Sequence, residues 1–128
     1  MSGLVVDTSV WVDFFAGRPS PVLEDGLAQG LVILPPVVVA ELVSGARLPK
    51  QRAEIVDLLR DLAIHPTPLA HWIAVGELRR RLAAKGVAIS TPDAHVAQCA
   101  LEADAALLSR DSVFREIVKQ TALRLSAG

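Results

Sequence analysis

Short apolar runs alternate with longer segments of helical periodicity along this chain, and this alternation restricts the folds available to it. The runs 4–6, 31–34 and 105–108 are aliphatic and of strand length. The segments 51–63 and 69–85 between them have the length and apolar spacing of amphipathic helices. Strands that alternate with helices form parallel sheets that helices cover on both faces. The sequence therefore predicts an α/β fold with a central parallel sheet.

Turn and cap residues indicate where the expected elements begin and end. Helix starts are expected at Ser20-Pro21 and Ser90-Thr91-Pro92, Thr8 or Ser9 is expected to cap the first helix, and Gly86 ends a long one. The expected strands are 4–6, 31–34, 105–108, a final strand at 123–125, and a brief strand or simple connection at 64–65. The expected helices are 10–15, 21–30, 37–47, 51–63, 69–85, 91–103 and 112–119.

Length and cysteine content bound the kind of domain. A chain of 128 residues with 52% apolar residues is expected to form one domain over residues 1–128, with a core that needs no disulfide. The single cysteine, Cys99, excludes an intrachain disulfide and a zinc site built from several cysteines. Cys99 is expected on the apolar face of a helix, buried and unreactive.

No segment has the pattern of a membrane anchor or a secretory leader. The longest apolar run, 31–40, is interrupted by two prolines and is shorter than the roughly 20 residues that span a bilayer. The N-terminal segment reaches Asp7 too early for a secretory signal. We therefore expect a cytoplasmic protein without membrane association.

Basic residues gather in two segments, although the formal net charge is only -1. Each segment is explained either as a solvated helix face or as a phosphate-binding surface, and the overall charge does not decide between them. The first segment contains Arg79, Arg80, Arg81 and Lys85, and the second contains Arg47, Lys50 and Arg52.

Two acidic residues stand at the expected carboxyl ends of strands, where open parallel sheets bind their ligands. Asp7 follows the first apolar run directly, and Asp111 follows the run 105–108 by a few residues. An acid at a helix start can also serve only as a cap, so capping remains an alternative explanation for both residues.

Two further acids have less direct indications. Asp93 lies in the first turn of an expected helix, directly after Thr91-Pro92, and complementing the helix dipole explains it as well as a site role does. Glu41 lies in the apolar segment 37–43, where a carboxylate must reach solvent or a cation. An exposed position on an amphipathic helix is the alternative for Glu41. Ser44 and Gly45 follow it at helical spacing and leave room for a ligand.

Convergence of the four acids would create an electrostatic conflict that metal ions resolve. Carboxylates held close together raise each other's pKa and oppose joint ionisation. Oxygen-rich sites suit Mg²⁺ and Mn²⁺, whose charge removes the conflict. A pair of such ions can activate water and stabilise the leaving oxygen in phosphodiester cleavage. Spacing along the chain does not by itself show that the acids converge.

Four stretches of the chain resemble the PIN-domain family, and within it the VapC-type toxins of bacterial toxin–antitoxin pairs. Each stretch is weakly specific alone, but together they occur in family order over nearly the whole chain. They are Leu4 to Phe15, with Asp7-Thr8-Ser9; Pro36 to Arg47, with Glu41; Thr91 to Ala97, with Asp93; and Ala105 to Phe114, with Ser109-Arg110-Asp111.

The resemblance implies a PIN-like three-layer α/β/α sandwich and a Mg²⁺- or Mn²⁺-dependent endoribonuclease that cleaves single-stranded regions of RNA by metal-activated water. It implies a homodimer that a VapB-type antitoxin neutralises. Carried over by position, it implies a catalytic and metal-binding site of Asp7, Glu41, Asp93 and Asp111, with supporting hydroxyls at Thr8 and Ser109. Because RNA is then the expected substrate, the candidates for phosphate contact are Arg79, Arg80, Arg81, Lys85 and Arg110.

Some residues depart from the family pattern or allow two explanations. Asp104 stands where many relatives have glycine, which predicts either a simple turn residue or an altered loop. Asp13 is expected on the outer face of the first helix. Core packing explains Trp11, Phe14 and Phe15, and a protein interface is the alternative for some of them.

The histidines receive no catalytic role from the sequence. His65, His71 and His95 have no metal-ligand spacing with one another or with Cys99. His95 lies two positions from Asp93, so the two side chains face apart on a helix. We therefore expect neither a histidine general base nor a histidine-bound metal.

Two other functions remain as alternatives. The first is a catalytically inactive PIN-like module that only binds partner proteins. The second is a phospho-acceptor signalling domain, which needs an acceptor aspartate after a middle strand and a lysine near the last one. Asp57 lies in an expected helix, and Ser109-Arg110-Asp111 contains no lysine, so the sequence opposes the second alternative.

Overall fold

The computed structural model describes residues 3–128, which form an α/β fold around a parallel sheet. Four strands, β1 (Leu4–Val6), β2 (Val32–Leu34), β3 (Ala63–Ile64) and β4 (Ala106–Leu108), pair in the order β3-β2-β1-β4. Leu4 pairs with Val32 on one side and with Ala106 on the other, and all the pairings are parallel. The expected parallel α/β architecture is confirmed.

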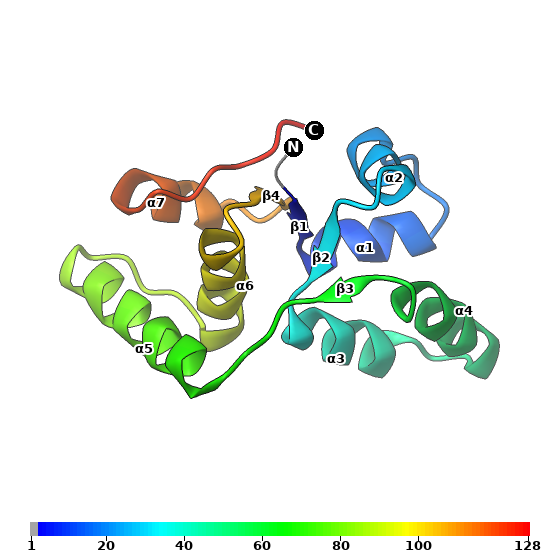
Figure 1. Cartoon of the computed structure of the whole chain (residues 1–128), viewed down its shortest axis with the longest axis horizontal. Helices are drawn as coiled ribbons and strands as arrows, with labels where there is room; N and C mark the ends of the chain where they lie inside the picture. The colour runs from blue at the N-terminus through cyan, green and yellow to red at the C-terminus, as the bar shows by residue number, and fades with distance from the viewer. Residues whose placement is uncertain (1–2) are drawn as a thin grey trace.

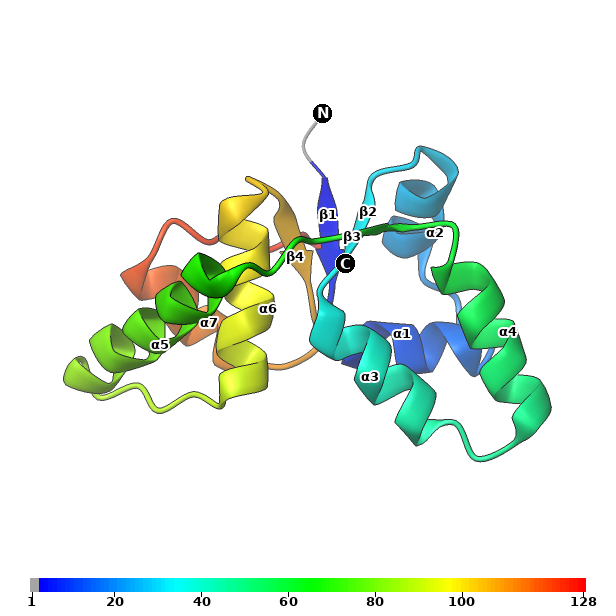
Figure 2. The ribbon, with the colours of Figure 1, turned by 60° about the horizontal axis from the view of Figure 1, so that its bottom comes forward.

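Helices flank this sheet on both sides. In Figures 1 and 2, α1 to α4 lie on one side of the strands along the long axis, and α5 to α7 lie on the other. The helices in the described residues are α1 (Thr8–Phe15), α2 (Pro21–Ala28), α3 (Pro36–Gly45), α4 (Pro49–Leu59), α5 (Leu69–Ala84), α6 (Thr91–Glu102) and α7 (Val113–Gln120). Within residues 3–128 no helix combines the length and the apolar character needed to cross a membrane.

The structure corrects several expected boundaries. α3 ends at Gly45 because Ala46 adopts an extended backbone, with ψ of 116°. α4 begins at Pro49, since proline fits the first turn of a helix, and it ends at Leu59. The expected cap of the first helix is wrong: Asp7 is the N-cap residue, and Thr8 and Ser9 already lie within α1.

Two of the expected strands also differ in the structure. The brief strand near His65 exists but covers Ala63–Ile64. The final strand expected at 123–125 is reduced to one parallel bridge between Leu107 and Leu125. The C-terminal segment therefore touches the edge of β4 without forming a regular strand.

Aliphatic side chains and one tryptophan build the core. Trp11 is fully buried and stacks on Phe15, so core packing explains its position. Phe14 and Phe15 are partly buried against the same core. Gly26 lets α2 approach the sheet closely, because a β-carbon there would lie 3.0 Å from Leu4 Cδ2.

Strand order determines which loops meet. β1 and β4 are neighbours, and the backbone pairing continues past the strands, since the Asp7 amide donates to the Leu108 carbonyl at 2.9 Å. In Figure 2 the starts of α1, α3 and α6 and the loop after β4 gather at one end of the sheet. This end carries the carboxyl termini of the strands, where a ligand site is expected.

Candidate active site

Asp7 lies at the carboxyl end of β1 and is 8% exposed. Its position is that of a helix cap, yet its side chain makes no capping hydrogen bond. Instead, Asp7 Oδ2 accepts hydrogen bonds from Ser9 Oγ at 3.1 Å and from Ser109 Oγ at 2.9 Å. Hydroxyl donors orient a carboxylate without neutralising it. The capping explanation therefore does not account for this side chain.

Glu41 reaches the same region from α3. Thr8 Oγ1 donates a 2.7 Å hydrogen bond to Glu41 Oε1, which joins the first residue of α1 to the middle of α3. Glu41 is exposed, as an acid on a helix surface can be. This exposed position leaves the carboxylate open to a cation from solvent.

Asp111 follows β4 and is tied to Asp7 through Ser109. The Asp111 amide donates to Ser109 Oγ at 3.0 Å, and the same hydroxyl donates to Asp7. Asp111 Oδ1 accepts the Val113 amide at 3.0 Å, which is the local capping contact that the sequence allowed. Capping therefore engages one oxygen of Asp111, and it does not exclude a second role for the carboxylate.

Asp93 lies in the first turn of α6, and Ser90 is the cap of this helix, as expected. The Asp93 amide donates to Ser90 Oγ at 3.1 Å. Burial raises the pKa of the Asp93 carboxyl; the Ser90 hydrogen bond opposes this, and the charges of Asp111, Asp7 and Glu41 raise it further. The hydrogen bonds that join Asp7 to Ser109, Ser109 to Asp111 and Thr8 to Glu41 bring these three acids to the end of the sheet at which α6 begins (Figure 2).

Within the described residues the four acids have no protein cation to balance them. Among the ion pairs formed within residues 3–128, none involves Asp7, Glu41, Asp93 or Asp111. Clustered carboxylates supported by hydroxyls are the donor set that Mg²⁺ and Mn²⁺ prefer. The donor types of these four residues therefore suit Mg²⁺ or Mn²⁺.

A fifth acid near this end of the sheet is neutralised differently. Asp13 pairs with Arg18 and with Arg110, whose Nε lies 2.6 Å from Asp13 Oδ2. Asp13 is thus a partner for arginine and not part of the uncompensated group. Arg110, expected to contact phosphate, lies between Ser109 and Asp111 on the loop after β4, and its side chain pairs with Asp13.

The basic segment of α5 lies on the surface, at its C-terminal half. Arg79, Arg80, Arg81 and Lys85 are all exposed. Arg79 Nε donates to the Ile89 carbonyl at 3.0 Å, and Arg80 pairs with Glu77. Exposure is compatible with both explanations of this segment, a solvated face and a phosphate-binding surface.

Asp104 has a purely local explanation. Its backbone is in the left-handed region, with φ of +49°, a conformation that favours glycine. Arg124 pairs with the Asp104 carboxylate at 3.1 Å and also donates to its carbonyl. Asp104 is therefore a turn residue that anchors the C-terminal segment.

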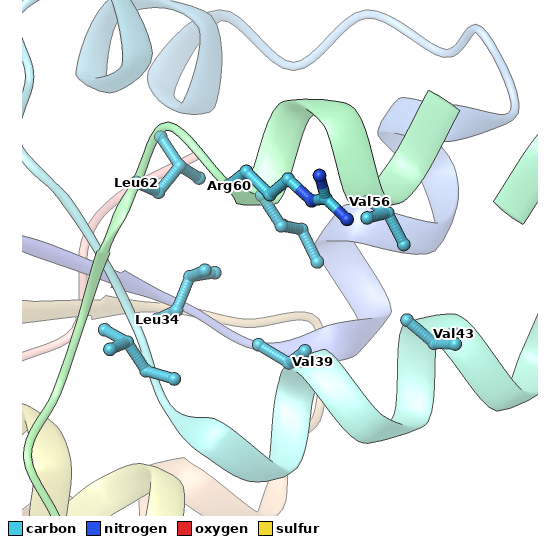
Figure 3. A pocket seen from close by; sticks show the side chains of 8 residues that line it. Leu34, Val39, Val43, Val56, Arg60 and Leu62 are labelled. Atoms are coloured by element: carbon cyan, nitrogen blue, oxygen red, sulfur yellow. The ribbon is translucent and has the colours of Figure 1, made fainter. Parts of the chain in front are cut away.

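An apolar groove lies between α3, α4 and β3, apart from the acidic site (Figure 3). It has a volume of about 280 Å³ and is lined by Leu34, Val39, Val43, Val56, Leu59, Arg60, Leu62 and Ile64. Figure 3 shows Arg60 extending along α4 at this groove, as the one charged side chain of the lining. Such a groove can accept apolar side chains of a partner.

The histidines are the group that reasoning from sequence missed. His65 and His71 both contact Glu102, and His71 also contacts His95, which lies near Cys99. Their wide separation along the chain gives no ligand motif. The only signal was the placement of His95, Cys99 and Glu102 at helical spacing, which puts them on one face of α6.

Comparisons with known proteins agree with this fold. The model of the PIN domain family matches residues 4–120. Among solved structures, a chain of VapBC2 from Rickettsia felis, bound to a promoter DNA fragment, superposes with a TM-score of 0.77 at 23% identity, covering 96% of each chain. A chain of VapBC from Salmonella typhimurium gives 0.76 at 18% identity, with 98% of each chain covered.

A third structure extends the likeness to the full length. A chain of VapBC-5 from Mycobacterium tuberculosis, described as a member of the VapBC family of toxin–antitoxin systems, gives a TM-score of 0.69 at 21% identity over 100% of both chains. No curated protein sequence matches the chain. At these identities the structural likeness shows a shared fold.

Proposed function

The chain belongs to the PIN-domain family, and on this premise we propose that it is a Mg²⁺- or Mn²⁺-dependent endoribonuclease, the toxin of a VapBC-type toxin–antitoxin pair. One observation carries the proposal. Four carboxylates, Asp7, Glu41, Asp93 and Asp111, share one end of the sheet and have no cationic partner in the described residues. The likeness to chains of VapBC complexes supports the toxin assignment.

The four carboxylates would hold the metal, and the hydroxyl side chains would hold the carboxylates. When bound, a divalent ion supplies positive charge to a phosphodiester and lowers the pKa of water. Ser109 and Ser9 fix the Asp7 oxygen that they contact, and Thr8 fixes Glu41. Loss of such orienting contacts commonly lowers metal affinity or activity by about 10- to 100-fold.

Basic side chains near the acids would position the RNA backbone. Arg110 lies between Ser109 and Asp111 on the loop after β4, and its guanidinium pairs with Asp13, an ion pair that an RNA phosphate would have to replace or share. Arg79, Arg80, Arg81 and Lys85 form an exposed basic strip on α5. Contacts of this kind orient a nucleic acid without reading its sequence. We propose that this activity takes place in the cytoplasm, because its RNA substrate is present there.

The direct test compares two aspartate variants. Purified chain without antitoxin should cleave single-stranded RNA with Mg²⁺ or Mn²⁺ and stop when a chelator is added. Asp7→Asn should abolish cleavage because the substitution removes charge and keeps size. Asp57→Asn on α4 is the matched control, since Asp57 is exposed and lies in a helix distant in sequence from the acids. Equal cleavage by Asp7→Asn and the wild type would refute the site.

The same two variants separate the two alternative functions, when phosphorylation is measured beside cleavage. An inactive PIN-like module would bind partners but show no metal-dependent cleavage in any variant. A phospho-acceptor domain would lose phosphorylation with Asp57→Asn; Asp57 lies within α4 and does not follow a strand, which opposes that function. The uncompensated carboxylates favour the nuclease, because a module without metal gains nothing from clustered like charges.

The apolar groove between α3 and α4 is the proposed seat of the antitoxin. Chains of similar fold were crystallised as VapBC complexes and as a toxin–antitoxin complex from Klebsiella pneumoniae. An antitoxin segment with apolar residues and an acid for Arg60 would complement the lining. Val43→Glu should weaken capture by the co-expressed antitoxin while RNA cleavage by the free toxin persists. Unchanged capture would exclude this groove.

A second copy of the chain is proposed to cover part of α5. Leu69, Trp72 and Ile73 lie on one face of this helix and are 76%, 41% and 57% exposed. Large exposed apolar side chains in one cluster favour a protein interface. Ile73→Lys should shift the molar mass measured by light scattering from a dimer to a monomer. A dimer that survives this change would exclude the α5 face.

A further inference from the structure

A second group of potential metal ligands lies apart from the four carboxylates. It consists of His65, just after β3, His71 in the first turn of α5, and Cys99 on α6. Glu102, one turn after Cys99 on α6, contacts both histidines. His65 is 8% exposed, His71 is 2% exposed and Cys99 is fully buried. Nitrogen and sulfur donors are concentrated here, whereas the carboxylate site offers only oxygen.

The donor atoms of this group lie close to one another. One ligating atom from each of His65, His71 and Cys99 lies within 4.8 Å of the other two. Glu102 Oε1 lies 2.7 Å from His65 Nε2 and 2.8 Å from His71 Nδ1. Ligand atoms of a tetrahedral zinc ion are about 3.3–3.6 Å apart, as follows from its bond lengths. In the metal-free chain Glu102 is hydrogen-bonded to both imidazoles, so an ion that enters would have to separate these atoms to the tetrahedral spacing.

We propose that His65, His71, Cys99 and Glu102 form a structural zinc site that is separate from the nuclease centre. Two imidazoles, a thiolate and a carboxylate are ligands that zinc prefers, and they are poor ligands for Mg²⁺. The two sites would thus select different metals by ligand chemistry. The site does not depend on the proposed nuclease activity.

A neighbouring residue orients one of the ligands. His71 Nε2 lies 2.7 Å from His95 Nδ1, and the Val37 amide approaches His95 Nε2 at 3.4 Å. Trp72 stacks on the His95 ring with centroids 4.7 Å apart, which fixes that ring in turn. A histidine that binds a metal through one ring nitrogen commonly donates the N–H of the other to a partner. With zinc on His71 Nδ1, the His71 Nε2–H would donate to His95 Nδ1, and His95 would carry its proton on Nε2 and give up the contact from the Val37 amide.

The position of the site gives the ion a structural task. The connection from β3 to α5 crosses from the side of α1–α4 to the side of α5–α7 (Figures 1 and 2). His65 and His71 stand at the two ends of this connection, and Cys99 and Glu102 stand on α6. An ion bound by all four side chains would link the connection between β3 and α5 to α6. Zinc binding should therefore raise the stability of the folded chain.

Cobalt(II) is the probe, because tetrahedral cobalt with a thiolate ligand absorbs strongly and octahedral cobalt on oxygen ligands absorbs weakly. Titration of the reduced, metal-free, full-length chain should give one equivalent of tetrahedral visible bands with a thiolate-to-cobalt charge-transfer band. Zinc should bleach both, and excess Mg²⁺ should not. Two results with folded wild-type chain would overturn the proposal: no cobalt binding, or cobalt binding without the thiolate band. Either result would mean that these side chains form only a hydrogen-bonded network.

Variants connect the spectrum to these side chains. Cys99→Ala should remove the charge-transfer band. His65→Gln retains an amide that can donate to Glu102 and loses the imidazole, so it should weaken cobalt binding at least about 10-fold while circular dichroism shows the folded state. Asp7→Asn should leave the cobalt spectrum unchanged, which separates the two sites. Cobalt affinity of His65→Gln equal to that of the wild type would contradict the proposal.

Thermal unfolding provides an independent readout. With Mg²⁺ in excess, zinc should raise the melting temperature of the wild type and of Asp7→Asn, because an ion that binds only the folded state stabilises it. His65→Gln should show no such increase. An equal increase in all three proteins would assign the zinc to another position and overturn the site.

Discussion

Thr8 Oγ1 donates a 2.7 Å hydrogen bond to Glu41 Oε1, across 33 positions of the chain. This contact links the residue after Asp7 to the acid of α3, so Thr8 holds Glu41 in position relative to Asp7. The contact also accounts for a hydroxyl at position 8, where a helix cap was expected and is not formed.

Replacement of Thr8 by valine removes this hydroxyl and keeps the shape of the side chain. Glu41 then loses the donor that orients it, and we expect the metal concentration for half-maximal RNA cleavage to rise about 10-fold. Cleavage measured across a series of Mn²⁺ concentrations tests this. Thr8→Ser, which retains the hydroxyl, should stay near the wild type. A normal metal requirement in Thr8→Val would show that Glu41 needs no support.

Ser109 connects Asp7 and Asp111 through one oxygen atom. Its hydroxyl donates to Asp7 Oδ2 and accepts the Asp111 amide. Ser109→Ala should lower the cleavage rate at saturating metal by roughly 10-fold or more, since both acids lose a fixed position. Ser126→Ala in the C-terminal segment is the control and should cleave normally. Similar rates for the two variants would contradict a supporting role of Ser109.

RNA binding by the basic strip of α5 should appear as salt dependence. In a cleavage-deficient Asp7→Asn background, Arg81→Gln and Lys85→Gln should each reduce the slope of log affinity against log salt by about 0.7, the value for one contact to single-stranded nucleic acid. Fluorescence anisotropy with labelled single-stranded RNA measures this slope. Arg47→Gln, in the other basic segment, is the control. Slopes that remain equal in all variants would favour the solvated-face explanation.

The histidine cluster should make the metal-free chain sensitive to mild acid. Burial lowers the pKa of His95 to about 4, with the charges of His71 and His65 acting in the same direction and Glu102 opposing them. In the unfolded chain His95 therefore binds a proton at its ordinary pKa of 6.5, whereas in the folded chain it stays neutral until the pH is near 4. The free energy of unfolding should fall by about 1.4 kcal/mol for each pH unit below that value, until the pH approaches 4.

Urea unfolding in the presence of a chelator, at several pH values between 7 and roughly 5, measures this slope. His95→Asn should flatten it, because the variant has no group that titrates there. Glu102 contributes only at lower pH: burial would raise its pKa, but hydrogen bonds from His65, His71 and Gln98 bring it below the usual 4.5. An undiminished slope in His95→Asn would assign the acid sensitivity to other residues.

Local patterns in the sequence were sufficient for the type and order of the elements. Apolar runs of strand length predicted β1, β2 and β4, and helical periodicity predicted the helices, because burial of one face is a local requirement. The ends of several elements differ from those predictions. The cap of α1, the end of α3 and the reduced C-terminal strand depend on side-chain and edge contacts that local patterns do not specify.

The sequence by itself determined a parallel α/β fold, with acids at the ends of the strands and at one helix start. Only the tertiary structure decided which residues meet. Pairing of β1 with β4 brings Ser109 to Asp7, and the packing of α1 against α3 brings Glu41 to Thr8. The same holds for the cluster of His65, His71 and Cys99, which no spacing predicted. Contacts between distant segments depend on strand order and helix packing, and these are properties of the whole chain.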